Sequence, residues 1–208
     1  MILFCGSSMY CLHNAMHESI FTAHAMAYAN KIISNPRTGQ QIRFIHTAAD
    51  TGGALLEMES VFGPQSVEPA AHYHPKQDEI FQVIEGELSV RLNKRVYKLV
   101  AGDVLHIAPC TVHSMWNSSD GITKVNWKVF PALDTEYLLE TGMGIAADGK
   151  AGEAGMPGIL QAAILIRHFR DVYRLARPSY TLQLLIVSIL SPFARLFGYR
   201  PLYPKYLD

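Results

Sequence analysis

Short stretches of alternating apolar and polar residues, separated by turn signals, run through residues 31–130. In residues 54–62, apolar side chains alternate with Glu57 and Glu59, which places both carboxylates on an outward face. Turn signals such as Gly86 recur at intervals of roughly ten residues, with no helical pattern between them. This pattern predicts an antiparallel sandwich or barrel and excludes a parallel sheet of alternating strands and helices. Further strands are expected at residues 68–74, 79–85, 87–92, 96–100, 103–107, 111–116 and 122–130.

The pattern becomes helical after Pro131. Residues 158–177 predict one long amphipathic helix, on which four arginines spaced by three or four residues form a basic stripe. Residues 179–197 form a second apolar segment, in which Ser191 and Pro192 predict an N-cap and a new helix start. We therefore expect three parts: a leader at residues 1–30, a β barrel at residues 31–135 and a helical extension at residues 136–208.

Charge divides the chain in a similar way. Lysine plus arginine and aspartate plus glutamate number 18 each, but residues 150–208 carry a net charge of +5 and residues 1–149 one of −5. The overall balance argues against a protein that binds the nucleic-acid backbone, which needs a basic excess. We expect the arginines of the extension to pair with carboxylates of the barrel, and contact with an anionic membrane surface is the alternative. The uncharged residues 178–194 fall short of the about 20 apolar residues that span a bilayer.

Residues 1–30 contain a loose group of metal-ligating residue types, which includes Cys5, Cys11, His13 and His17. Their spacing does not match the ligand pairs of zinc sites, so we interpret the segment as a leader. The chain has three cysteines and no Cys-x-x-Cys pair, which argues against a disulfide framework. Because no basic segment precedes an apolar run near residue 1, we expect a cytoplasmic location.

Residues of metal-binding type gather in the middle of the predicted barrel. His72 and His74 occupy positions i and i+2 of a predicted strand, so their imidazoles point to the same face. Glu79 begins the next strand, and His113 lies on the strand at residues 111–116. Imidazoles with one carboxylate suit a divalent transition metal ion with open coordination positions. A His-x-His pair alone is more often a chance pair of surface or core histidines, so the flanking residues decide.

Those flanks resemble the two sequence motifs of the cupin superfamily. The first motif, G-x(n)-H-x-H-x4-E-x6-G, is matched by His72, His74, Glu79 and Gly86. The second, G-x5-P-x-G-x2-H-x3-N, is matched in part, by Gly102, His113 and Asn117. Ala108 stands at the proline position and Cys110 at the turn glycine of that motif. The arrangement resembles small bacterial cupin-type proteins with a helical C-terminal extension.

The resemblance implies an all-β fold: a cupin-type jelly-roll (double-stranded β-helix) barrel over about residues 40–130, commonly as a homodimer. It implies a metal site near one mouth of the barrel that holds one divalent transition metal ion, which could be Fe, Mn, Ni, Cu or Zn. The ligands that it implies are His72, His74, Glu79 and His113.

Strand parity predicts the lining of the pocket beside these ligands. Phe81 and Val83 share the face of Glu79, Met115 shares the face of His113, and Trp127 points inward on the last strand. Such a lining is apolar and aromatic and nearly free of cations, which disfavours a phosphosugar substrate. The alternative for these side chains is plain core packing.

Three functions fit this sequence. The first is a metal-dependent dioxygenase that acts on an apolar or aromatic small molecule, with Glu79 as the catalytic base. The second is a metal-assisted isomerase or hydrolase, and the third is a non-catalytic protein that binds a small molecule. We also expect a homodimer, because the extension carries apolar surface that self-association would bury.

Overall fold

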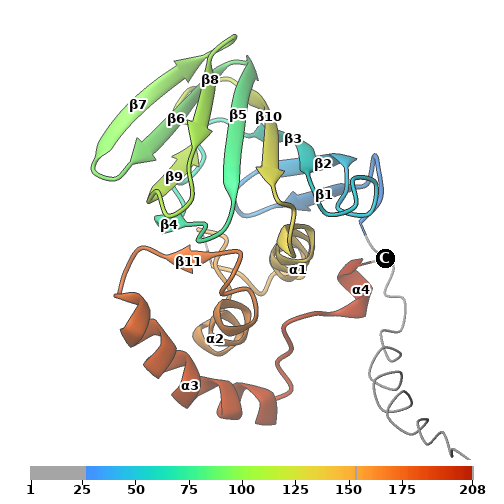
Figure 1. The fold of residues 1–208 in the computed structure, drawn as a ribbon, viewed down its shortest axis with the longest axis vertical. Coiled ribbons are helices and arrows are strands. Elements are labelled where there is room, and N and C mark those ends of the chain that lie inside the picture. Colours follow the sequence, from blue (N-terminus) through green and yellow to red (C-terminus); the bar gives the residue numbers. More distant parts are fainter. Residues whose placement is uncertain (1–26, 153, 208) are drawn as a thin grey trace, which may run out of the picture.

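Residues 27–152 and 154–207 are described in a computed structural model of the chain (Figure 1). The predicted leader, with its cysteines and histidines, lies outside the described residues apart from its last four positions. Two sheets occupy one half of the molecule in Figure 1, and the C-terminal helices lie beneath them.

Both sheets are antiparallel throughout. The first contains, in spatial order, β1 (Ile32–Asn35), β2 (Gln40–His46), β3 (Leu56–Phe62), β10 (Thr123–Phe130), β5 (Asp78–Glu85) and β8 (Val104–Ile107). The second contains β11 (Arg174–Leu175), β4 (His72–Tyr73), β9 (His113–Trp116), β6 (Glu87–Leu92) and β7 (Arg95–Val100). Two antiparallel sheets and a C-terminal helical extension confirm the predicted class in outline, and closure of the sheets into a barrel stays a prediction.

Alternation along the strands builds the core, as expected from a period of two. On β3, Leu56 and Met58 are fully buried, whereas Glu57 and Glu59 point outward. Both carboxylates form ion pairs with basic side chains of the neighbouring strands β2 and β10. On β10, Val125 and Val129 are also fully buried. These strands therefore carry one apolar face into two core clusters, which meet at the half-buried Trp127.

The strand predicted at residues 68–74 is much shorter in the structure and consists of His72 and Tyr73 alone. Pro69 and Pro75 flank it, and a proline nitrogen has no hydrogen to donate to a sheet. The remaining β-strand predictions agree with the structure to within about two residues at each end.

The helical extension departs further from the sequence prediction. It contains α1 (Thr135–Ala147), α2 (Ile159–His168), α3 (Tyr180–Leu196) and α4 (Pro204–Leu207). The predicted long helix over residues 158–177 is wrong beyond His168, because the following residues leave the helix and form β11 on the free edge of β4. Phe169 and Val172 are buried and anchor this turn, and Pro178 disfavours a helical conformation at the residue before it. The predicted arginine stripe is therefore not formed.

The predicted break at Ser191 is also wrong, since α3 continues through Pro192. The Ser191 hydroxyl donates to the carbonyl oxygen of Val187 inside the helix instead of capping a new one. None of the helices in the described ranges is both long and apolar enough to cross a membrane.

The ion pairs between the extension and the part of the chain that carries the sheets, Lys31–Glu140 and Lys76–Asp171, differ from the expected ones. Among the described residues, no arginine of the extension forms an ion pair with a carboxylate of the sheets. Lys76, between β4 and β5, pairs instead with Asp171 of the extension at 3.2 Å, the reverse of the predicted arrangement. Gln77 adds a neutral link, because its Nε2 donates to Thr135 Oγ1 and to the carbonyl oxygens of Pro131 and Ala132.

Candidate metal centre

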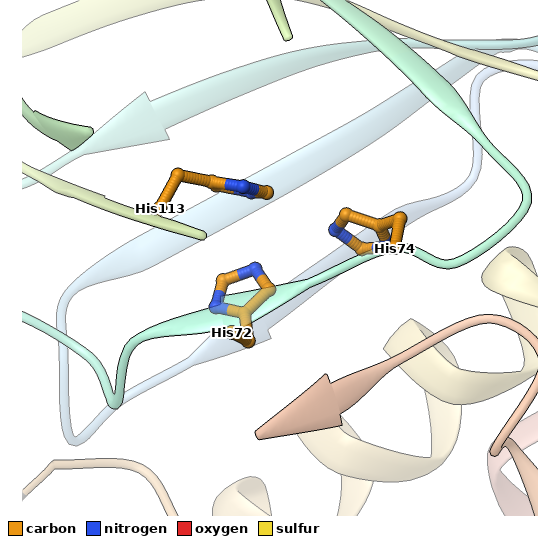
Figure 2. Close-up of side chains that lie close together, drawn as sticks. All are labelled: His72, His74 and His113. Atoms are coloured by element: carbon orange, nitrogen blue, oxygen red, sulfur yellow. The ribbon is translucent and has the colours of Figure 1, made fainter. Parts of the chain in front are cut away.

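Three histidines from two neighbouring strands point into one space (Figure 2). His72 lies on β4 directly opposite His113 on β9, and His74 follows β4 by one residue. One nitrogen of each ring lies within 4.8 Å of the corresponding nitrogen of the other two. The sheet register therefore produces the ligand spacing of a metal ion from residues that are about forty positions apart in the sequence.

Glu79, the second residue of β5, faces these rings from the other sheet. Its Oε2 lies 3.0 Å from His113 Nε2 and 3.3 Å from His74 Nε2, and the residue is 1% exposed. Within the described residues, Glu79 Oε2 and His74 Nε2 are buried without a hydrogen-bond partner. Buried polar atoms without partners are costly, and a cation bound between them would remove that cost. The three imidazoles thus have the spacing of a metal site, and Glu79 faces them as a candidate fourth ligand.

The backbone orients each imidazole. Nδ1 of His72 lies 3.1 Å from the carbonyl oxygen of Ala70, and Nδ1 of His113 lies 2.9 Å from that of Thr111. Nδ1 of His74 lies 2.6 Å from the carbonyl oxygen of Val172, in the helical extension. A carbonyl can only accept, so each Nδ1 carries the hydrogen in the neutral ring and Nε2 keeps its lone pair for a metal.

The electrostatics of the cluster favour neutral imidazoles at His72 and His74 beside a charged carboxylate, whereas His113 is shifted the other way. Burial, reinforced by the neighbouring histidines, lowers the pKa of His72 to about 3, and burial also lowers the pKa of His74. For Glu79, burial raises the pKa, but the facing histidines outweigh it and the net change is downward. For His113, burial lowers the pKa, and the contact with Glu79 reverses that effect and raises it.

Trp127 on β10 holds the other oxygen of the carboxylate, since its indole Nε1 donates to Glu79 Oε1 at 3.0 Å. The indole also stacks on Phe81, with 5.4 Å between the ring centroids. One oxygen of Glu79 is therefore fixed and the other faces the imidazoles.

The four candidate ligands lie at the wall of a cavity of about 270 Å³. Of the predicted pocket residues, Phe81, Met115 and Trp127 line it, whereas Val83 is 1% exposed and packs in the second core cluster. No lysine or arginine is among the lining residues that the structure describes, in agreement with the sequence analysis.

The helical extension supplies a part of this wall that no motif in the sequence indicates. Tyr173, just before β11, stacks on His72 with 4.7 Å between ring centroids and lines the cavity. Leu139 of α1 and Leu165 of α2 also line the cavity. The spacing of the residues after His168 predicted a helix, and nothing in it indicated that they would form a strand on the edge of β4.

The turn before His113 accommodates the departure from the second motif. Cys110, at the glycine position, has a φ of 64°, in the left-handed region that favours glycine. Its backbone nitrogen donates to the carbonyl oxygen of His74 at 2.8 Å. The residue at the glycine position thus adopts the conformation that favours glycine. Its hydrogen bond links the turn before His113 to the backbone of His74.

Comparison with known proteins agrees with this geometry. Residues 58–129, which include all four candidate ligands, match the family described as Cupin domain. The chain therefore contains a cupin domain.

A curated relative of the chain is quercetin 2,3-dioxygenase from Bacillus subtilis, which is 32% identical over 106 residues. The match covers 50% of this chain and 31% of the relative, so this chain spans less than a third of the length of that protein.

Solved structures with a similar arrangement include KdgF from a Halomonas species, with 21% identity and a TM-score of 0.43. That match covers 50% of this chain and 88% of the other. An uncharacterised protein with a double-stranded β-helix domain from Klebsiella pneumoniae has 22% identity and a TM-score of 0.40, covering 55% of this chain and 91% of its own. Both similarities involve about half of the chain.

Proposed function

We propose that this cupin binds one divalent transition metal ion through His72, His74, Glu79 and His113 and is a dioxygenase of an apolar or aromatic small molecule. The observation that carries the proposal is the convergence of three backbone-oriented imidazoles and an unpartnered carboxylate oxygen at the wall of an apolar cavity. Fe, Mn, Ni and Cu accept such a mixed set of nitrogen and oxygen ligands. When bound, such an ion supplies a redox-active Lewis acid next to the cavity.

Glu79 has the position of a general base. Its Oε2 faces the space between the imidazoles, where, once released as a ligand, it would accept the proton of an enolic or phenolic hydroxyl. Trp127 is the positioning residue, because its indole holds Oε1 and leaves Oε2 to move the proton. The stacked Phe81 and Trp127 rings and Met115 exclude water from the same space.

The lining of the cavity favours the substrate class. A phosphorylated substrate needs a cation to compensate its charge, and the described lining contains none. A volume of about 270 Å³ suits a compact molecule that is largely buried when bound. The similarity to a quercetin 2,3-dioxygenase further supports the reaction class. Dioxygenation adds both atoms of O2 to the substrate, so no external reductant is required.

The test begins with protein purified without a histidine tag. Elemental analysis should find about one divalent transition metal ion per chain, and an oxygen electrode should record uptake with a panel of phenolic compounds that includes quercetin. Glu79→Gln keeps the shape of the side chain but removes the base, so we expect uptake to fall at least about 100-fold. Glu85→Gln, on the exposed end of the same strand, is the matched control and should leave uptake unchanged.

A second measurement separates catalysis from binding. Trp116 and Trp127 are the only tryptophans, and Trp116 lies on β9 against Arg91, away from the ligands. Trp116→Phe therefore leaves Trp127 as the sole reporter of metal and ligand entry by fluorescence. If ligands quench Trp127 and raise the melting temperature while no compound supports oxygen uptake, the chain is a non-catalytic binding protein.

A further inference from the structure

Helix α3 presents its most apolar face to solvent. Its exposed large residues recur at spacings of three and four, so they form one continuous stripe along the helix. Leu196 is 82% exposed and Ile189 is 56% exposed. This outer face consists of Leu182, Leu185, Ile186, Ile189, Phe193, Leu196 and Phe197.

The opposite, inner face of α3 contains smaller or more polar residues. Gln183, Val187, Ser191 and Ala194 are buried, and the helix packs mainly on α2. In Figure 1, α3 forms the lower boundary of the molecule, with α2 between it and the sheets. A helix that only served the core of a globular protein would show the reverse distribution. The outer face therefore has the composition of a contact surface.

Positively charged residues lie at both ends of this face. Residues 154–207 contain seven basic residues and a single acidic one, Asp171. Arg177 precedes α3, Arg195 lies in its last turn and Arg200 follows it. Arg195 also lines a polar pocket, whose other charged members are Arg167, Arg170 and Asp171. Cations thus bracket the apolar stripe at both ends.

We propose that α3 lies in the plane of an anionic lipid surface, with its outer face among the acyl chains and its flanking arginines among the phosphate groups. Its 17 residues extend for about 25 Å, which suits a helix lying flat rather than spanning. Long arginine side chains reach from such a depth to the headgroups. This inference is independent of the proposed function, because none of the residues that carry it contacts the metal ligands.

A second copy of the chain is the competing occupant. In a pair of antiparallel α3 helices, the Arg177 end of one copy would face the Arg195 and Arg200 end of the other, so positive charges would meet at both ends of the interface. Anionic headgroups instead complement the charge at both ends. Charge complementarity therefore favours the lipid surface.

The test uses the full chain with vesicles of phosphatidylcholine alone and with a phosphatidylglycerol mixture, in co-sedimentation at low and moderate salt. Wild-type protein should bind the anionic vesicles and lose affinity as salt rises. Ile189→Glu/Phe193→Glu should weaken binding at least 10-fold. Val96→Glu/Val104→Glu makes the same change at exposed apolar positions of β7 and β8, and it should have no effect.

A charge variant supplies the second, independent test. Arg195→Glu/Arg200→Glu should weaken binding to anionic vesicles and should flatten the salt dependence, with unchanged circular dichroism and metal content as evidence of folding. Failure of wild-type protein to bind anionic vesicles overturns the proposal. So does a stable dimer in light scattering that Ile189→Glu/Phe193→Glu dissociates, because the outer face would then be an interface between copies.

Discussion

The sheets and the helical extension reach the same cavity in different ways. The sheets bring His72, Glu79 and His113 together through strand parity and register, over about forty residues of sequence. The extension reaches the same point from about sixty residues further along, with a backbone carbonyl at Val172 and the ring of Tyr173. The ligands can be recognised in the sequence by their side-chain chemistry. The groups that orient and cover them, such as a backbone carbonyl, cannot.

The largest effect should come from removing two ligands of the sheets. His72→Ala/His74→Ala takes two imidazoles from four donors, so we expect metal affinity to fall more than 100-fold, measured by elemental analysis after dialysis. His46→Ala is the control, since this exposed histidine pairs with Glu57 on β3 and is not among the residues that line the cavity. Full metal content in the double variant would show that the metal lies elsewhere.

Within the sheets, one glycine of the first motif is held by backbone packing. A Cβ at Gly86 would lie 2.3 Å from the carbonyl oxygen of Ile122, and the φ of Gly86 is 79°. Gly86→Ala should therefore lower the free energy of unfolding by about 3 kcal/mol or more, measured by urea denaturation. Gly102→Ala has a similar φ of 97° but open space around it, so it should cost only about 1 kcal/mol. Equal costs would mean that backbone conformation alone matters at Gly86.

The contribution of the extension to the site is tested by Tyr173→Ala. Loss of the ring that stacks on His72 should reduce metal affinity about 10-fold, as expected for a residue that supports a ligand without being one. Metal titration monitored through Trp127 would measure this change. Tyr199→Ala, at an exposed position of the same extension, should leave affinity unchanged. If both variants bind metal like the wild type, the two regions are independent.

The smallest effect concerns the junction between the regions, where Glu136 of α1 accepts a hydrogen bond from the backbone of Ala48 at 3.0 Å. Burial raises the pKa of Glu136 above its ordinary value. Its folded-state pKa is thus above its unfolded value, so it contributes stability at low pH and loses that contribution as pH rises through the raised pKa. Glu136→Gln should raise stability at pH 8 by roughly 1 kcal/mol with little change at pH 4.

Thermal unfolding as a function of pH measures this effect. Glu59→Gln, on the outward face of β3, is the control and should follow the wild-type curve. If the Glu136→Gln curve runs parallel to the wild-type curve at all pH values, the folded protein does not favour the protonated form of Glu136.

The sequence predicted the sheets better than the extension for a physical reason. A period of two reports directly which face of a strand is buried, and Phe81, Met115 and Trp127, which it predicted to point inward, line the cavity. Val83 shares the parity of Phe81 but lies deeper in the core, because parity gives the face and not the depth. The residues that follow α2 have helical spacing in the sequence, and only a tertiary contact, with the free edge of β4, turned them into β11.

The hydrogen bond between His74 and Val172 has a consequence for the order of events during synthesis. The ribosome completes the last candidate ligand, His113, about sixty residues before it makes Val172. At about 5–20 residues per second, this leaves an interval of several seconds in which all candidate ligands have been synthesised. During that interval, His74 lacks its hydrogen bond to the carbonyl oxygen of Val172. Metal captured in that interval would exchange more readily than metal in the finished chain, and the carboxyl-terminal residues would set the moment at which the ion is retained.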